Sequence, residues 1–297
     1  RGSDATPLSG PPAWGRVARR AASDVPGGGD ESAARPRRRR DDATEPRSTS
    51  PRPDGSLPDE DALRATASGA VARGRDTPVR ERSPLPGRPH GLPDPEVAIK
   101  RQLGEPAASK AVKRLRTAGV AFEAERFDDA RRAIGPLVKD VPGVAEVREL
   151  AGLIAYRRGK WSEAVDHLEA FRHISGSTEL HPVLADCHRA LGHWGDVDLL
   201  WEELGGASPA PDIVTEGRIV TAGARADRGD LDGAIRLLEK GWKIPKTPRE
   251  YHLRRAYALA DLYDRAGRTP RARELFRWVE AQAPDLADVA ARVRALG

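Results

Sequence analysis

The chain has a single cysteine, no methionine and few aromatic residues, which make up 5% of its 297 positions. Cys187 has no second cysteine to pair with, so an internal disulfide is excluded, as is usual in reducing compartments. No apolar run reaches the roughly 18 residues that a membrane-spanning helix needs, and the first ten residues lack the apolar centre of a signal peptide. We therefore expect a cytoplasmic protein with no membrane contact. Because methionine is missing, we also expect the native chain to start upstream of Arg1.

Charge and composition divide the chain into two parts. Of the net charge of +5, residues 1–90 carry +4 and residues 91–297 carry +1. Proline, glycine, serine and arginine crowd the first part, whose only aromatic residue is Trp14, and apolar periodicity is confined to the second. A segment with so little apolar surface cannot offset the roughly 1 to 2 kcal/mol of backbone entropy that each ordered residue costs. We predict that residues 1–90 form a disordered tail.

The tail contains one dense run of positive charge, formed by Arg35, Arg37, Arg38, Arg39 and Arg40. Arginine-rich segments bind nucleic acid by displacing counterions from phosphates. Here, however, acidic residues follow the run directly, beginning with Asp41 and Asp42, and they oppose such contact. A solvated, solubilising tail is the favoured interpretation. Association with nucleic acid or with a ribosome through these arginines is the alternative.

Beyond the tail, one pattern recurs. Residues 147–171, VRELAGLIAYRRGKWSEAVDHLEAF, predict two amphipathic helices joined by a tight turn at Gly159. A shift of 34 residues places Trp161 on Phe127 and Gly152 on Ala118, so bulky residues match bulky ones and small residues match small ones. Small residues are needed where two helices cross closely. Two short helices with this period resemble the tetratricopeptide repeat family.

The resemblance implies an all-α, right-handed α-solenoid of about five helix-turn-helix repeats over residues 110–284. The repeats are expected at about 111–144, 145–177, 178–210, 215–245 and 250–284. Residues 91–109 are predicted to form a proline-rich hinge with one short helix, for which Asp94 is the N-cap. The apolar face of residues 285–297 predicts a helix from Asp285 that covers the last repeat. Glu125 departs from the pattern, because other repeats have glycine at that turn.

In this family the first helix of each repeat lines the concave face, where partners bind. Carried onto this chain, these positions are Leu115, Phe122, Glu149, Leu153, Tyr156, Arg157, Asp186, Arg189, Asp227, Arg254, Tyr257, Asp261, Asp264 and Arg265. Some members hold a partner's C-terminal carboxylate with Lys and Asn, but Glu149 and Leu153 stand in those places, so that partner is not expected. Phe122 and Tyr156 fit packing between adjacent first helices equally well, and the charges fit an ordinary solvated face.

Histidines gather around the third repeat beside the cysteine, at His167, His173, His181, Cys187, His188 and His193. Imidazole and thiolate bind zinc, but paired cysteines and an HExxH spacing are missing, and His181 and His188 fall where the family packs its helices. A lone helical cysteine is typical of a buried residue rather than a nucleophile. We therefore expect no metal, no cofactor and no enzymatic activity. The sequence predicts a scaffold that binds a partner peptide or helix.

Overall fold

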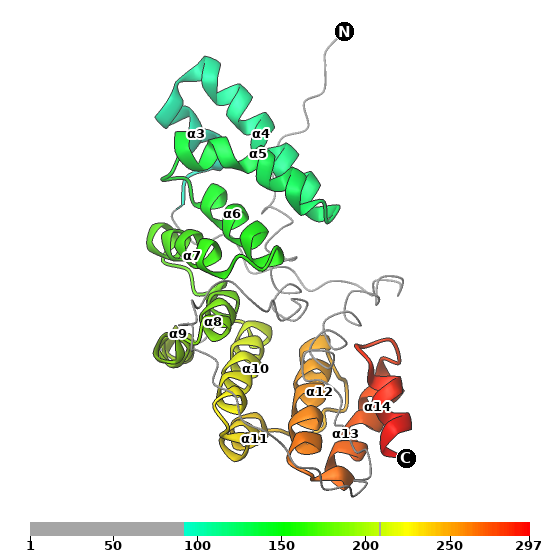
Figure 1. Ribbon diagram of the computed structural model, residues 1–297. Helices are drawn as coiled ribbons and strands as arrows, with labels where there is room; N and C mark the ends of the chain where they lie inside the picture. Colours follow the sequence, from blue (N-terminus) through cyan, green and yellow to red (C-terminus); the bar gives the residue numbers. More distant parts are fainter. Residues whose placement is uncertain (1–91, 208) are drawn as a thin grey trace, which may run out of the picture.

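The computed structural model describes residues 92–207 and 209–297. Within these ranges the chain forms twelve helices and no strands, stacked in chain order into a right-handed solenoid (Figure 1). The predicted all-α solenoid class is thereby confirmed. The predicted tail, with Arg35, Arg37, Arg38, Arg39 and Arg40, lies outside the described residues. Among the described helices, none combines the length and apolar character required to cross a bilayer.

Five helix pairs form the repeats, and we name the first helix of each pair helix A and the second helix B. The pairs are α4 (Glu105–Glu123) with α5 (Phe127–Asp140), α6 (Ala145–Arg157) with α7 (Trp161–Ser175), α8 (His181–Ala190) with α9 (Trp194–Ala207), α10 (Pro211–Asp227) with α11 (Leu231–Glu239), and α12 (Glu250–Arg265) with α13 (Thr269–Gln282). The helix α3 (Pro95–Leu103) precedes them and α14 (Val289–Leu296) follows. In Figure 1 the stack forms an arc with α6, α8, α10 and α12 along its inner side and α7, α9 and α11 along its outer side.

A tight turn joins helix A to helix B in every repeat, and one residue of each turn has a left-handed backbone. Its φ is 69° at Gly159, 74° at Gly192, 87° at Gly229 and 69° at Gly267. In repeat one the same conformation falls on Glu125, with a φ of 58°. A residue with a Cβ atom is strained there. Repeat one therefore keeps the same turn as the other repeats, although Glu125 stands where they have glycine.

Residues 92–109 contain the short helix that was predicted there. The side chain of Asp94 caps α3 by accepting a backbone N–H at 2.8 Å, and Gly104, with a φ of 73°, ends this helix. The next helix, α4, starts immediately at Glu105 instead of near residue 111. Proline and alanine in its first turns favour this early start. Ile99 of α3 is fully buried against the first repeat.

The last helix is shorter than predicted, because α14 begins at Val289 and not at Asp285. Ala287 has a positive φ of 50°, which interrupts any helix before it. Val289 is nevertheless fully buried, and Leu286 packs against the same core. The segment therefore covers the end of the solenoid although its first residues are turns.

Two hydrophobic cores run through the solenoid and meet in α10. The first extends from α3 to α9 and includes Val220 and Ala224 of α10. The second includes Ala222 and Ala226 of the same helix and continues to α14. Alternate apolar side chains of one helix thus serve two separate clusters.

Two arginines hold the C-terminal end of α11. Arg218 of α10 donates to the carbonyl of Lys240 at 3.0 Å, and Arg255 of α12 donates to the carbonyls of Leu238 at 2.6 Å and Lys240 at 2.7 Å. The last carbonyls of a helix have no partner within it, so these guanidinium groups replace the missing donors. Burial, and secondarily the charge of Arg218, lower the pKa of Arg255 to about 10. Its guanidinium also lies 5.4 Å from the ring centroid of Trp242, which follows α11 in the connection.

Helices α6 and α7 approach most closely at Gly152. A Cβ atom there would lie 2.7 Å from the side chain of Leu168 and 3.3 Å from its backbone nitrogen. Substitution of Gly152 by alanine is expected to destabilise the protein by about 1 to 3 kcal/mol through overpacking, despite the higher helix propensity of alanine. Urea unfolding followed by circular dichroism measures the change. The matched control is Gly195→Ala in α9, where an added Cβ meets nothing within 4 Å and alanine should be neutral or stabilising by up to about 1 kcal/mol. Equal effects at both glycines would contradict the close approach.

Candidate functional site

The residues predicted to face a partner lie on the helices A, which line the inner side of the arc (Figure 1). We name this surface the inner face. Its predicted members are Leu115 and Phe122 on α4, Glu149, Leu153, Tyr156 and Arg157 on α6, Asp186 and Arg189 on α8, Asp227 on α10, and Arg254, Tyr257, Asp261, Asp264 and Arg265 on α12. Equivalent positions on successive helices therefore follow one another along the arc.

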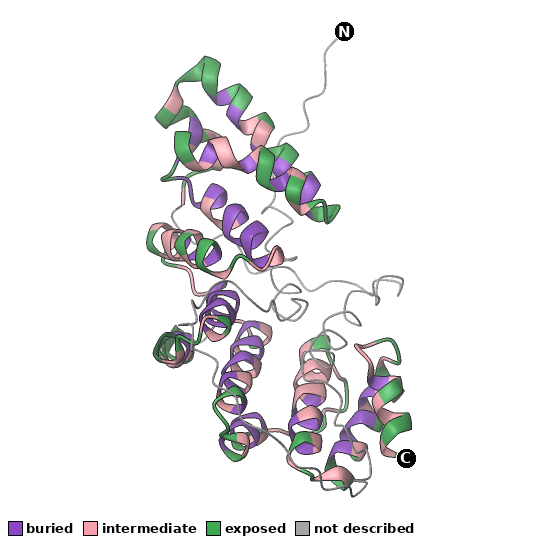
Figure 2. Cartoon of the chain, viewed as in Figure 1, coloured by how far each residue is buried: buried purple, intermediate pink, exposed green. Residues whose placement is uncertain are grey.

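Several of these side chains are interior and not available to a partner. Leu115, Phe122, Leu153 and Tyr156 belong to the first hydrophobic core, and Asp186 is also buried. This burial favours the packing role that the sequence also allowed for Phe122 and Tyr156. Figure 2 shows the consequence, with α6 and α8 buried along most of their length and α9 largely exposed.

A chain of hydrogen bonds joins α6, α8 and α10 across the inner face. The hydroxyl of Tyr156 donates to Asp186 at 2.7 Å. Arg189 then donates to Asp186 at 2.8 Å and to Asp227 at 2.7 Å. Burial raises the pKa of Tyr156, and the carboxylate of Asp186 raises the pKa of Arg189. The tyrosine therefore stays protonated and the arginine stays charged at neutral pH.

A second ion pair joins α12 to α10. Arg254 donates to Glu216 at 2.7 Å, and both side chains are nearly enclosed. Burial raises the pKa of Glu216, and the charge of Arg254 opposes that shift. At the other end of the inner face, Arg157 lies 3.5 Å from Glu125 and 4.6 Å from the ring centroid of Phe127. Many predicted binding charges thus also connect neighbouring repeats.

The C-terminal end of the inner face is organised by Arg292 of α14. Its guanidinium donates to Asp261 at 2.9 Å, to Asp264 at 3.2 Å and to Asp288 at 3.3 Å. Asp288 also accepts a hydrogen bond from the half-buried Tyr257. The sequence alone does not identify these partners of Arg292. Arg265 remains the most exposed of the predicted arginines, at 40%.

Sequence reasoning also missed a series of carboxylates on the inner face. Glu146, Glu179 and Glu216 each stand six residues before the small crossing residue of repeats two, three and four. Glu146 and Glu216 are buried, and Glu179 is half-buried. At the end of α4, Glu123 is exposed. These glutamates could have been recognised in the sequence, because each stands at the same distance before the small residue of its repeat.

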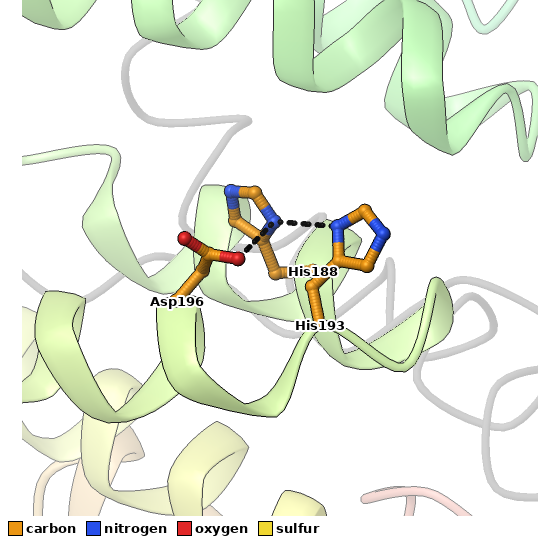
Figure 3. Close-up of side chains that lie close together, drawn as sticks. All are labelled: His188, His193 and Asp196. Atoms are coloured by element: carbon orange, nitrogen blue, oxygen red, sulfur yellow. Dashed lines mark hydrogen bonds and ion pairs between the residues drawn. The ribbon is translucent and has the colours of Figure 1, made fainter.

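Within the predicted histidine group, the structure brings together His188, His193 and Asp196 at the turn of repeat three (Figure 3). His188 is buried near the end of α8, whereas His193 and Asp196 are exposed before and within the first turn of α9. Asp196 lies outside the group of histidines and cysteine that the sequence suggested. Burial lowers the pKa of His188, which favours the neutral imidazole.

The remaining members of that group have other surroundings. Nδ1 of His167 lies 3.1 Å from an arginine of α6, and Nε2 of His181 lies 3.0 Å from Glu203. Cys187 is fully buried, and burial raises the pKa of its thiol well above the usual range. A protonated, enclosed thiol is a packing group and a poor nucleophile.

Comparison with known proteins identifies the repeats. Residues 115–177, which span most of repeat one and all of repeat two, match the family model described as tetratricopeptide repeat. The resemblance predicted from the sequence is thereby confirmed. The search of curated proteins gives no match to the chain. Among solved structures, a thermophilic tetratricopeptide repeat protein of Thermus thermophilus aligns with 18% identity and a TM-score of 0.49, covering 63% of this chain and 98% of that one.

Proposed function

We propose, starting from the tetratricopeptide repeats at residues 115–177, that this chain is a non-enzymatic scaffold that binds a segment of a partner protein along its inner face. Repeat solenoids present extended surfaces on which an elongated ligand contacts several units at once. The accessible residues of helices A supply such a surface here. The buried aromatic residues Phe122 and Tyr156 hold the scaffold, which leaves Tyr257 as the half-exposed aromatic on this face.

The observation that carries the proposal is the charge of the accessible inner face. Its carboxylates include Glu123, Glu149, Asp227, Asp261 and Asp264, and Arg292 of α14 pairs with two of them. The opposing guanidinium groups are Arg157, Arg189, Arg254 and Arg265. Because complementary potentials steer association and select partners, we infer that the bound segment carries charged side chains.

Charge reversal on the inner face is expected to weaken capture of the native partner at least tenfold, or about 1.4 kcal/mol. The variant combines Glu123→Lys and Glu149→Lys on helices A. Its matched control combines Glu163→Lys and Glu202→Lys, two exposed residues on helices B, so that net charge changes equally. Affinity capture from a lysate with the full chain, followed by titration of the captured protein, measures the difference. Circular dichroism checks that both variants keep the parent's melting temperature.

A third variant separates the proposal from its alternative. Changing Arg37, Arg38, Arg39 and Arg40 to glutamate should leave capture unchanged if the inner face binds the partner. If the partner or a nucleic acid is held by the arginine-rich segment, this variant loses it and the inner-face variant does not. That second pattern would reject the scaffold proposal.

A further inference from the structure

The turn of repeat three places three metal-ligating side chains around one point (Figure 3). Nδ1 of His188 is 3.3 Å from Nδ1 of His193 and 3.8 Å from Oδ2 of Asp196. The ligand atoms of all three residues lie within 4.8 Å of one another. They come from both sides of one tight turn, so the chain needs no rearrangement to present them together.

These distances are close to those between neighbouring ligand atoms around one metal ion. Two imidazole nitrogens bound to Zn²⁺ at about 2.0 to 2.1 Å in tetrahedral geometry lie about 3.3 Å apart, which matches the separation of His188 and His193. The carboxylate of Asp196, at 3.8 Å, reaches the same ion after a small rotation of an exposed side chain. We propose that His188, His193 and Asp196 form a binding site for a divalent transition metal ion, with Zn²⁺ as the best match and water as the fourth ligand.

The backbone fixes the two histidines relative to each other. The amide of His193 donates to the carbonyl of His188 at 2.9 Å, and Gly192 between them adopts a φ of 74°. Asp196 follows one turn later at the start of α9. Metal sites gain affinity when ligands are held near their bound positions before the ion arrives. An ion here would tie helix A to helix B of repeat three.

Repeats one and two indicate that packing alone does not require this arrangement. In repeat two, the positions equivalent to His188, His193 and Asp196 hold Ala155, Lys160 and Glu163. In repeat one they hold Ala121, Arg126 and Asp129. A small apolar residue thus fills the first position in both repeats, and a cation occupies the second, where it would repel a metal ion. The turn keeps its conformation in all of them, so the histidines of repeat three are additional to what the fold needs.

Calorimetric titration of the chelator-treated full chain with zinc chloride tests the site. We expect one ion per chain, with affinity reduced at least tenfold in His193→Ala and in Asp196→Asn. Both residues are exposed, so neither change should disturb folding, and circular dichroism verifies this. His173→Ala, at an exposed histidine on α7, is the matched control and should bind zinc as the parent does.

Cobalt provides an independent measurement, because Co²⁺ in a tetrahedral site gives visible absorption that free Co²⁺ lacks. The parent and His173→Ala should develop this absorption, and His193→Ala should not. Zinc should also raise the melting temperature of the parent, since a ligand that binds only the folded state stabilises it, and it should leave that of His193→Ala unchanged. Failure of the parent to bind zinc, or binding that survives both His193→Ala and Asp196→Asn, would overturn the proposal.

Discussion

Replacing Tyr156 by alanine is expected to lower the free energy of unfolding by about 3 to 5 kcal/mol, the usual cost of removing a large aromatic side chain from a core. The ring is fully buried and packs edge to face against Trp161, with ring centroids 5.6 Å apart. Its hydroxyl is also a donor to the buried Asp186. The substitution therefore removes apolar packing and a hydrogen bond together. Urea unfolding, followed by circular dichroism and tryptophan fluorescence, measures the change.

The variant Tyr156→Phe separates the two contributions. It keeps the ring in place and removes only the donor to Asp186, which retains Arg189 as a partner. We expect a loss of about 1 to 3 kcal/mol, the range for leaving one buried polar group short of a hydrogen bond. A loss below 1 kcal/mol in Tyr156→Ala would show that the ring is not part of the core, and would restore Tyr156 as a candidate for partner contact.

Replacing Arg292 by alanine is expected to destabilise the C-terminal repeat by about 3 kcal/mol. Removal of one member of a buried ion pair costs about 3 to 5 kcal/mol because the remaining charge loses its partner. Arg292 and Asp288 are 14% and 10% exposed, but Asp261 and Asp264 are 28% exposed, so water compensates them in part and the lower limit applies. Amide hydrogen exchange should show α14 and the end of α12 losing protection together, while α6 and α7 keep theirs.

The matched control is Arg294→Ala, an exposed arginine on the same helix, which should change stability by less than about 0.5 kcal/mol. A double-mutant cycle with Asp261→Ala adds a direct measurement of coupling. The combined loss should be smaller than the sum of the single losses, because removing the aspartate also removes a carboxylate left without its partner. Strict additivity would mean that the pair between Arg292 and Asp261 contributes nothing to stability.

The fold was predictable because it depends on features that are local in sequence. The 34-residue spacing, the left-handed glycines at the turns and the small residues at helix crossings each specify geometry within one repeat. Glu125 shows the limit of such patterns, since the turn keeps its conformation without glycine. The early start of α4 at Glu105 was missed because the prolines near it suggested an extended segment, although proline is compatible with the first turn of a helix.

The inner face was only partly predictable, because it depends on distances between repeats. Helical periodicity shows that Tyr156 and Arg157 share one side of α6, but it cannot show that α8 approaches closely enough to bury the tyrosine. Nor can it show that Arg189 reaches Asp227 on the next helix A. The group at His188 was missed for a related reason, because its third member, Asp196, is recognisable only after the turn is folded.

The sharing of α10 between two cores has a mechanical consequence. Val220 and Ala224 anchor this helix to the preceding repeats, while Ala222 and Ala226 anchor it to the following ones. Trp201 of α9 also packs against the second core. Because each repeat touches only its neighbours, a load that pulls the ends of the solenoid apart crosses from one core to the other at α9 and α10. The repeats before α10 and the repeats after it therefore have separate cores. We expect one half of the solenoid to be able to extend at α10 while the other half keeps its length.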